Sequence, residues 1–276
     1  MRAFAIVLCA ALLLDGESEP APTPNPYAIL ARARDVFHAH VRPPYVVYNL
    51  DRREWIDDRA RGDLSYTLRV WYRSRDGAAL SRIWYQARRR AVGDLHFIRP
   101  AFNQPIDPGP PTADIFEAAP PSPPSTPPPP DTLRTIGTVQ VSADLDYRAT
   151  LAGADRGAYH LKLQALRDPE RNRLRELWVD VTTFEVQRAR AVDRLFFEAA
   201  GASVPDRMDI TFESRNGLPL VHRIDAIADV IPTFASLSLR EESDYSFDDI
   251  SFPEVLPDWY FEPKAYREHF RESPSL

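Results

Sequence analysis

The feature that most constrains this chain is the alternation of apolar and polar side chains over most of its length. In residues 139–149 every second side chain is apolar, and the intervening ones are polar or charged. Successive side chains of a β-strand point to opposite faces, so this period predicts strands with one buried face. Strands are expected at 45–48, 64–72, 80–91, 139–149, 159–165, 174–181, 184–192, 207–213, 218–227 and 237–247.

Turn sequences join several of these strands into hairpins. Arg75-Asp76-Gly77, residues 153–157 and Asp168-Pro169 favour turns, and Asn216-Gly217 is the strongest short hairpin signal in the chain. About nine or ten antiparallel strands joined in this way make an up-and-down meander. A sheet of this length must curl, and its apolar face needs a cover.

One amphipathic helix is predicted before the strands. Asn25 and Pro26 suit the N-cap and the first helical position. Apolar residues follow at helical spacing as far as about His40, and Pro43-Pro44 ends the helix. The fold class is therefore α+β and mostly β, with a strongly curved antiparallel meander covered by an N-terminal helix. A short C-terminal helix is expected within 258–270.

The remaining segments have compositions of their own. Residues 1–16 combine Met1-Arg2 with an apolar run and predict a secretory signal peptide, with a buried helix or a lipidated Cys9 as alternatives. Residues 17–25 form a polar tether. Residues 105–130 contain 12 prolines in 26 positions and predict a surface insertion with disordered or polyproline character. Residues 26–270 are expected to form a single domain.

Composition and motifs argue against several function classes. The net charge of −6 disfavours nucleic-acid binding. One cysteine and six scattered histidines exclude a disulfide framework and a thiolate zinc site. The chain has no G-x-S-x-G, S-x-x-K, P-loop or G-x-G-x-x-G motif. We therefore expect a monomeric protein that is not an enzyme and has no cofactor, metal site or catalytic residue.

A few polar and aromatic residues leave alternatives open. Asp144 and Asp146 share one strand face at about 7 Å, a separation that suits an inverting glycosidase, although that face is expected to meet solvent. His38 and His40 lie at the helix end, where capping is favoured over metal binding. Trp71 and Trp178 fall opposite the apolar set of their strands, so either both faces are buried there or the rings line a second contact surface.

One stretch resembles a known superfamily. Leu177-Trp178-Val179-Asp180, then Thr182-Thr183 and Val186-Gln187-Arg188, is similar to a pair of hairpins in the outer-membrane lipoprotein-sorting superfamily of LolA-like and LolB-like proteins. The resemblance implies a half-barrel whose concave side is plugged by helices and whose apolar cavity holds acyl chains. No residue here matches the cavity arginine of the carriers, and the insertion 105–130 stands where the family has a second lid helix.

These observations favour an exported, non-catalytic binding protein of the periplasm or the secreted fraction. Its expected ligand is a lipid or an acylated lipoprotein, and another envelope protein is a further candidate partner. The alternative is an envelope structural or interaction module whose cavity is filled by side chains. The expected cavity lining is Tyr66, Leu68, Val70, Leu145, Tyr147, Leu161 and Leu163.

Overall fold

The computed structural model describes residues 24–62, 65–86, 101–102, 109–116, 146–169, 172–193, 206–230 and 239–269. The predicted signal segment and most of the tether and the insertion lie outside these residues. The elements are α1 (Pro26–His38), β1 (Tyr45–Ile56), β2 (Arg59–Ala60), β3 (Tyr66–Arg73), β4 (Ala78–Gln86), β5 (Ala101–Phe102), β6 (Tyr147–Asp155), β7 (Ala158–Ala165), β8 (Leu174–Asp180), β9 (Val186–Asp193), β10 (Asp206–Arg215), β11 (Leu218–Val230), β12 (Leu239–Ser251), the 3-10 helix η4 (Asp258–Phe261) and α2 (Pro263–His269).

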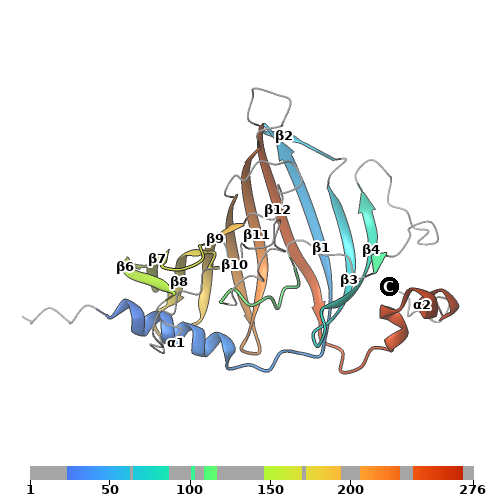
Figure 1. The fold of residues 1–276 in the computed structure, drawn as a ribbon, viewed down its shortest axis with the longest axis horizontal. Helices are drawn as coiled ribbons and strands as arrows, with labels where there is room; N and C mark the ends of the chain where they lie inside the picture. Colours follow the sequence, from blue (N-terminus) through green and yellow to red (C-terminus); the bar gives the residue numbers. More distant parts are fainter. Residues whose placement is uncertain are drawn as a thin grey trace, which may run out of the picture.

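All the described strands belong to one antiparallel sheet. Its order is β5-β4-β3-β1-β12-β11-β10-β9-β8-β7-β6, and β2 pairs with β1. The sheet curves and keeps two edges, at β5 and β6, so it does not close into a barrel (Figure 1). The helix α1 lies along the end formed by β6 to β9. The predicted fold class, a mostly β curved antiparallel meander with an N-terminal helix, is confirmed.

The meander is broken at one point that the sequence pattern did not predict. β5 and β6 follow one another in the chain, yet they form opposite edges of the sheet. The first and last long strands, β1 and β12, pair with each other in the middle of the sheet. In that pairing Leu50 lies opposite Phe247, and both side chains are buried. The segment that contains the insertion therefore connects the two edges.

The local sequence explains the helix and the turns. The Asn25 side chain accepts a hydrogen bond from the Tyr27 amide at 3.0 Å, which caps α1 as predicted. Both residues of Asn216-Gly217 have positive φ, as a two-residue hairpin turn of type I′ requires. The turn predicted at 153–157 is shorter, because β6 continues to Asp155 and only Arg156-Gly157 turn.

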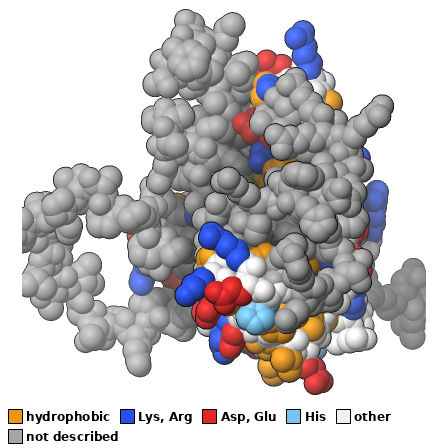
Figure 2. Space-filling model, turned by 90° about the vertical axis from the view of Figure 1, so that its right-hand side faces the viewer, with side chains coloured by type: hydrophobic (Ala, Val, Ile, Leu, Met, Phe, Trp, Pro, Cys, Tyr) orange, Lys and Arg blue, Asp and Glu red, His pale blue; other side chains and the backbone are white. Residues whose placement is uncertain are grey.

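The apolar residues form two clusters on opposite faces. The larger one unites the buried side of α1 with one face of the sheet, which is called the concave face here. The smaller one lies on the other, convex face, where Val47 and Trp71 pack against Tyr260 and Tyr266 of the C-terminal segment. Figure 2 views this end of the molecule, and apolar and charged side chains intermingle in its lower half. Trp71 is therefore buried because the sheet is covered on both sides at β3.

Candidate functional site on the concave face

The predicted lining residues that the structure describes lie at two ends of the sheet. Val70, Leu161 and Leu163 are buried, while Leu68 and Tyr147 are half-buried against the larger cluster. Tyr66 is half-buried at the end of β3, and Leu145 lies outside the described residues. Six strands separate β3 from β7. The predicted residues thus share the large apolar face but do not gather in one small site.

Helix α1 fills one end of this face with its own side chains. Ile29, Leu30, Ala33 and Phe37 are buried against the sheet. The Phe37 ring meets the Phe116 and Phe212 rings edge to face, with centroids 5.4 and 5.9 Å apart. Pairs of this geometry add about 0.5–1.5 kcal/mol beyond the burial of their area. Phe37 therefore anchors the C-terminal end of the helix.

Residues 109–116 of the insertion also pack on the concave face. Ile115 and Phe116 contact the larger cluster, and Pro111 is buried. The Val221 amide donates to the Pro111 carbonyl at 2.7 Å. A bulge in β11 places Phe212 opposite Val221 and Thr211 opposite Arg223, so the ladder is irregular at this point. This part of the insertion, expected as an irregular surface segment, is thus folded onto the sheet.

Asp114 links the insertion to the end of α1. One of its carboxylate oxygens lies 2.8 Å from the His38 ring nitrogen and 2.8 Å from an Arg42 guanidinium nitrogen. The other accepts the Phe116 amide at 2.9 Å. The carboxylate is 9% exposed, whereas the His38 and Arg42 side chains are 45% and 50% exposed. We call this contact the Asp114 clasp, because it ties α1 to residues 109–116.

Two small pockets lie on either side of Phe37. One is formed mainly by α1, β9 and the hairpin of β10 and β11, and the other by residues 37–42, Thr112 and the start of β11. Each has a volume of about 80 Å³. Ligand pockets for small molecules usually measure about 300–1,000 Å³. An acyl chain therefore does not fit either pocket unless α1 or the insertion moves.

A buried charged pair lies further along the concave face, beyond the apolar residues. Along β1, alternate side chains Tyr48, Leu50, Arg52 and Glu54 share this face, and Arg52 donates to the Glu54 carboxylate. The Arg52 guanidinium carbon lies 5.7 Å from the centre of the Tyr66 ring. The Glu54 side chain is only 2% exposed. The face is therefore amphipathic, with apolar residues followed by the hydrogen-bonded Arg52–Glu54 pair.

The environment of Glu54 favours its neutral form. Burial raises the pKa of this carboxyl to about 7, and the nearby Glu241 acts in the same direction, while Arg52 opposes both. Buried titratable groups with shifted pKa values are frequent at functional sites. Sequence reasoning missed this pair because only Tyr45–Tyr48 show an apolar strand pattern, whereas β1 continues to Ile56. No local signal marks the pair, because residues 51–54 are all charged and show no apolar alternation.

The described residues among the polar side chains singled out from the sequence form no metal site, and the Asp144–Asp146 pair is described only in part. Asp146 is described just before β6, and Asp144 lies outside the described residues. His40 packs over the β10–β11 turn, since a Cβ on Gly217 would lie 2.7 Å from its ring. Within the described ranges no group of three or more potential metal ligands comes together. The same residues include no helix that is both long and apolar enough to span a bilayer.

Comparison with known proteins gives structural similarities only. No protein-family model and no curated protein matches the sequence. Among solved structures, a LolA superfamily protein from Nitrosomonas europaea matches with 15% identity over 87% of this chain and 98% of that one, at a TM-score of 0.38. A domain described as an outer-membrane lipoprotein-sorting protein from Vibrio parahaemolyticus matches with 8% identity over 86% and 96%, at a TM-score of 0.42.

The MucA/MucB complex of Pseudomonas aeruginosa also matches, with 12% identity over 83% of this chain and 99% of that one, at a TM-score of 0.21. The first two descriptions name the superfamily that the stretch around Trp178 resembles. All three TM-scores are below 0.5, so this likeness does not decide what the chain binds.

Proposed function

We propose that this chain is an exported, non-catalytic binding protein that takes an acyl chain of a lipid or lipoprotein between α1 and the concave face. The observation that carries the proposal is an extended apolar face whose α1 end is closed by one helix and a short clasped segment. The face ends in the Arg52–Glu54 pair, where the polar part of an amphipathic ligand would lie. The resemblance around Trp178 supports the same ligand class.

The free energies of burial allow an acyl chain to replace the α1 side chains on the concave face. Returning Ile29, Leu30 and Phe37 to water costs roughly 1.5–3 kcal/mol each, or about 5–9 kcal/mol together. An acyl chain of about fifteen methylenes gains roughly 12 kcal/mol on burial, at ~0.8 kcal/mol per methylene. A long acyl chain can therefore replace the helix side chains, whereas one of about six methylenes cannot.

The first test is native mass spectrometry of residues 17–276 purified from an exporting host, with organic extraction of bound material. The proposal predicts a stoichiometric adduct whose extract contains a long acyl chain. A protein that has no adduct, and gains none after incubation with long-chain fatty acid or phospholipid, contradicts it.

A variant pair tests whether α1 is the gate. Phe37→Ala removes the anchoring ring and should increase the rate of uptake of cis-parinaric acid, measured by its fluorescence. Arg32→Ala on the exposed side of α1 is the matched control and should leave the rate unchanged. Equal rates in Phe37→Ala and the wild type would exclude gating by the helix.

A second candidate function is an interaction module of the cell envelope with a side-chain-filled face. The small size of both pockets beside Phe37, about 80 Å³ each, favours it. This module would bind another envelope protein and no lipid. A persistent apo mass in the experiment above, together with capture of an envelope protein, supports this candidate over the carrier.

A further inference from the structure

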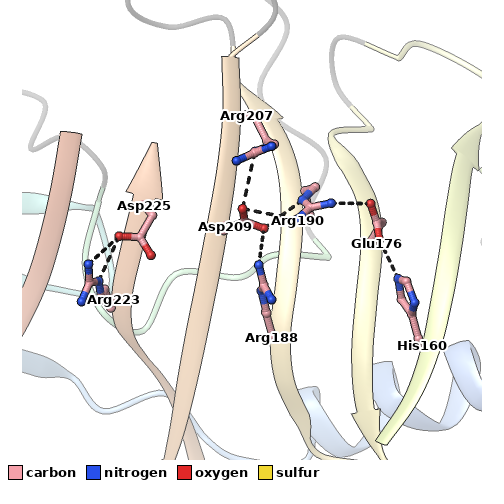
Figure 3. Close-up of polar contacts among 8 residues, drawn as sticks. All are labelled: His160, Glu176, Arg188, Arg190, Arg207, Asp209, Arg223 and Asp225. Atoms are coloured by element: carbon pink, nitrogen blue, oxygen red, sulfur yellow. Dashed lines mark hydrogen bonds and ion pairs between the residues drawn. The ribbon is translucent and has the colours of Figure 1, made fainter. Parts of the chain in front are cut away.

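The convex face of β7 to β10 carries a surface of one tryptophan, one histidine and three arginines, on the side of the sheet opposite α1; Figure 3 shows its charged residues and His160. Trp178 of β8 lies opposite His160 of β7 and Arg188 of β9. The His160 and Trp178 rings are nearly parallel, with an interplanar angle of 8° and centroids 4.5 Å apart. The Arg188 guanidinium carbon lies 4.6 Å from the centre of the Trp178 ring. Cross-strand register thus holds the tryptophan between a histidine and an arginine.

Two carboxylates lie under this surface and hold its arginines. Asp209 of β10 accepts from Arg190 at 2.8 Å and pairs with Arg188 at 3.0 Å and Arg207 at 3.5 Å. Glu176 of β8 pairs with Arg190 at 2.7 Å. Glu176 also lies 2.6 Å from the ring nitrogen of His160. The Trp178 platform is defined here as His160, Trp178, Arg188, Arg190 and Arg207.

The carboxylate of Asp209 is more deeply buried than the arginines Arg188 and Arg207 that it pairs with. Asp209 is 12% exposed, whereas Arg188 and Arg207 are 43% and 52% exposed. Three arginines face two carboxylates, so the surface that meets solvent is cationic. Each guanidinium has five N–H donors, and the contacts of Arg188 and Arg207 with Asp209 each involve one nitrogen, so donors remain for a further acceptor.

The carboxylates remain ionised and keep the arginines in place. Burial acts to raise the pKa of Asp209, but the hydrogen bond from Arg190 and the charges of Arg190 and Arg188 outweigh it, and the pKa lies below its usual value. The pKa of Glu176 is lowered in the same way, because the hydrogen bonds of His160 and Arg190 outweigh its burial. The cationic surface is thus pre-organised, which reduces the entropic cost of binding.

We propose that the Trp178 platform docks a short acidic segment of a protein partner, whose carboxylates pair with Arg188 and Arg207 and whose chain packs against the half-buried edge of Trp178. Tryptophan and arginine are the residue types most enriched among those that dominate binding energy in protein interfaces. The inference goes beyond acyl-chain binding, since it concerns the opposite face of the sheet and does not need α1 to move.

The neighbouring strands limit the size and nature of the occupant. Asp225 of β11 lies opposite Asp209, and Asp244 of β12 lies opposite Asp225. Both aspartates pair with Arg223, at 2.8 and 3.0 Å, so beyond β10 two carboxylates share one arginine and the excess of cations ends. A wide anionic surface such as a membrane would meet these carboxylates and the net charge of −6. A short segment meets only the platform, and the ring contacts of Trp178 are with the polar side chains His160, Arg188 and Arg190.

The test measures binding of the full chain to a ten-residue peptide of alternating Glu and Ser by isothermal titration calorimetry, at low salt and at physiological ionic strength. The Gln-for-Glu peptide is the probe control. We expect binding that weakens with salt and is lost with the Gln peptide, because the contact is electrostatic. Arg188→Glu combined with Arg207→Glu should weaken it by at least about tenfold.

The matched control is Arg59→Glu together with Lys264→Glu, since both side chains are exposed, they belong to β2 and α2 and not to β7–β10, and the change in net charge is the same. This control should retain affinity within about threefold, since its charges act at longer range. Equal losses in the two double variants would overturn the proposal, because net charge alone would then explain binding. Failure of the Glu peptide to bind at low salt, or binding of phosphatidylglycerol vesicles in its place, would overturn it as well. Each double variant is checked for a native circular dichroism spectrum.

Discussion

The two faces of this sheet shift the pKa of a carboxylate in opposite directions. On the concave face Glu54 is paired with Arg52, but burial outweighs the charges of Arg52 and Arg61 and raises its pKa to about 7. On the convex face Asp209 pairs with three arginines and keeps a lowered pKa. The comparison teaches that the number of donors decides the outcome, because each added charge-assisted hydrogen bond offsets part of the desolvation cost.

The two faces also differ in how much of each is buried by an apolar cluster. The concave cluster runs over most of the strands and includes α1. Among the described residues, the buried members of the convex cluster are Val47, Trp71, Leu80 and three aromatic residues of the C-terminal segment. The concave face therefore holds the fold together, whereas the convex face is mostly a solvent-facing ladder of ion pairs with one local cover.

The largest expected effect is on the free energy of unfolding, and it differs between two adjacent residues of β7, Leu161 and Lys162. Leu161 is fully buried on the concave face, and Lys162 is exposed on the convex face. Leu161→Ala should lower the free energy of unfolding by about 2–5 kcal/mol, since it leaves a cavity. Lys162→Ala should change it by at most about 0.5 kcal/mol. Urea unfolding measures both, and similar losses would contradict the assignment of the faces.

The pH dependence should have opposite signs on the two faces. Glu54 is protonated in the folded state up to about pH 7 but ionises near pH 4.3 when unfolded. Folded molecules thus bind more protons in this window, so stability falls as pH rises from about 4.5 to 7, by up to about 3 kcal/mol. Above about pH 7 Glu54 is ionised in both the folded and the unfolded state, so its contribution to stability does not change further. The difference in unfolding free energy between wild type and Glu54→Gln isolates this contribution.

Glu176 is the matched carboxylate of the convex face. Its lowered pKa stabilises the fold at pH values above the unfolded pKa, and this stability is lost as pH falls through the lower, folded pKa. Relative to Glu176→Gln, the wild type should therefore lose stability on acidification below about pH 4.3. If the two variants give pH profiles of the same sign, the contrast between the faces is wrong.

The local cover of the convex face should detach before the sheet unfolds. Tyr260 is buried, and its ring centroid lies 5.9 Å from that of Trp71. Tyr260→Ala should cost only about 1–2 kcal/mol of global stability, because the loss cannot exceed the free energy of docking the segment. Tyr260→Phe is the control, since the hydroxyl has no hydrogen-bond partner among the described residues. Hydrogen exchange at 258–269 should rise sharply in the alanine variant alone.

The smallest expected effect concerns the Asp114 clasp. Asp114→Asn removes the charge that contacts His38 and Arg42, and both of these side chains are largely exposed. The expected loss is at most about 1 kcal/mol, with faster hydrogen exchange at the end of α1. Asp155→Asn at the exposed Arg156 pair is the control and should alter neither measurement. Unchanged exchange in α1 would show that the clasp does not hold the helix.

Much of the fold could be predicted because its signals are local. The cap at Asn25 and the turn at Asn216-Gly217 depend on a few adjacent residues, and both were confirmed. The strands β7, β8 and β9 were predicted within about two residues, since their alternation matches a half-buried sheet. The curvature followed from the number of strands. The ligand and the cavity lining remain predictions.

The parts that could not be predicted depend on contacts between distant residues. β1 was predicted to end at Tyr48, because the following residues 51–54 are all charged and carry no apolar signal. Pairing with both β3 and β12 extends it to Ile56. The folding of 109–116 onto the sheet depends on Asp114 meeting His38 and Arg42, which lie more than 70 residues away in the sequence.

The sequence by itself determined the strands, the helix, the tight turns and the face that each apolar side chain takes, because these follow from the two-residue period and from short-range backbone preferences. Only the tertiary structure decided that β1 pairs with β12 in the middle of the sheet and that the segment with the insertion connects its two edges. It alone also placed Glu54 and Asp209 in opposite electrostatic environments. These outcomes depend on burial and on charges brought together across the sheet, which no local pattern encodes.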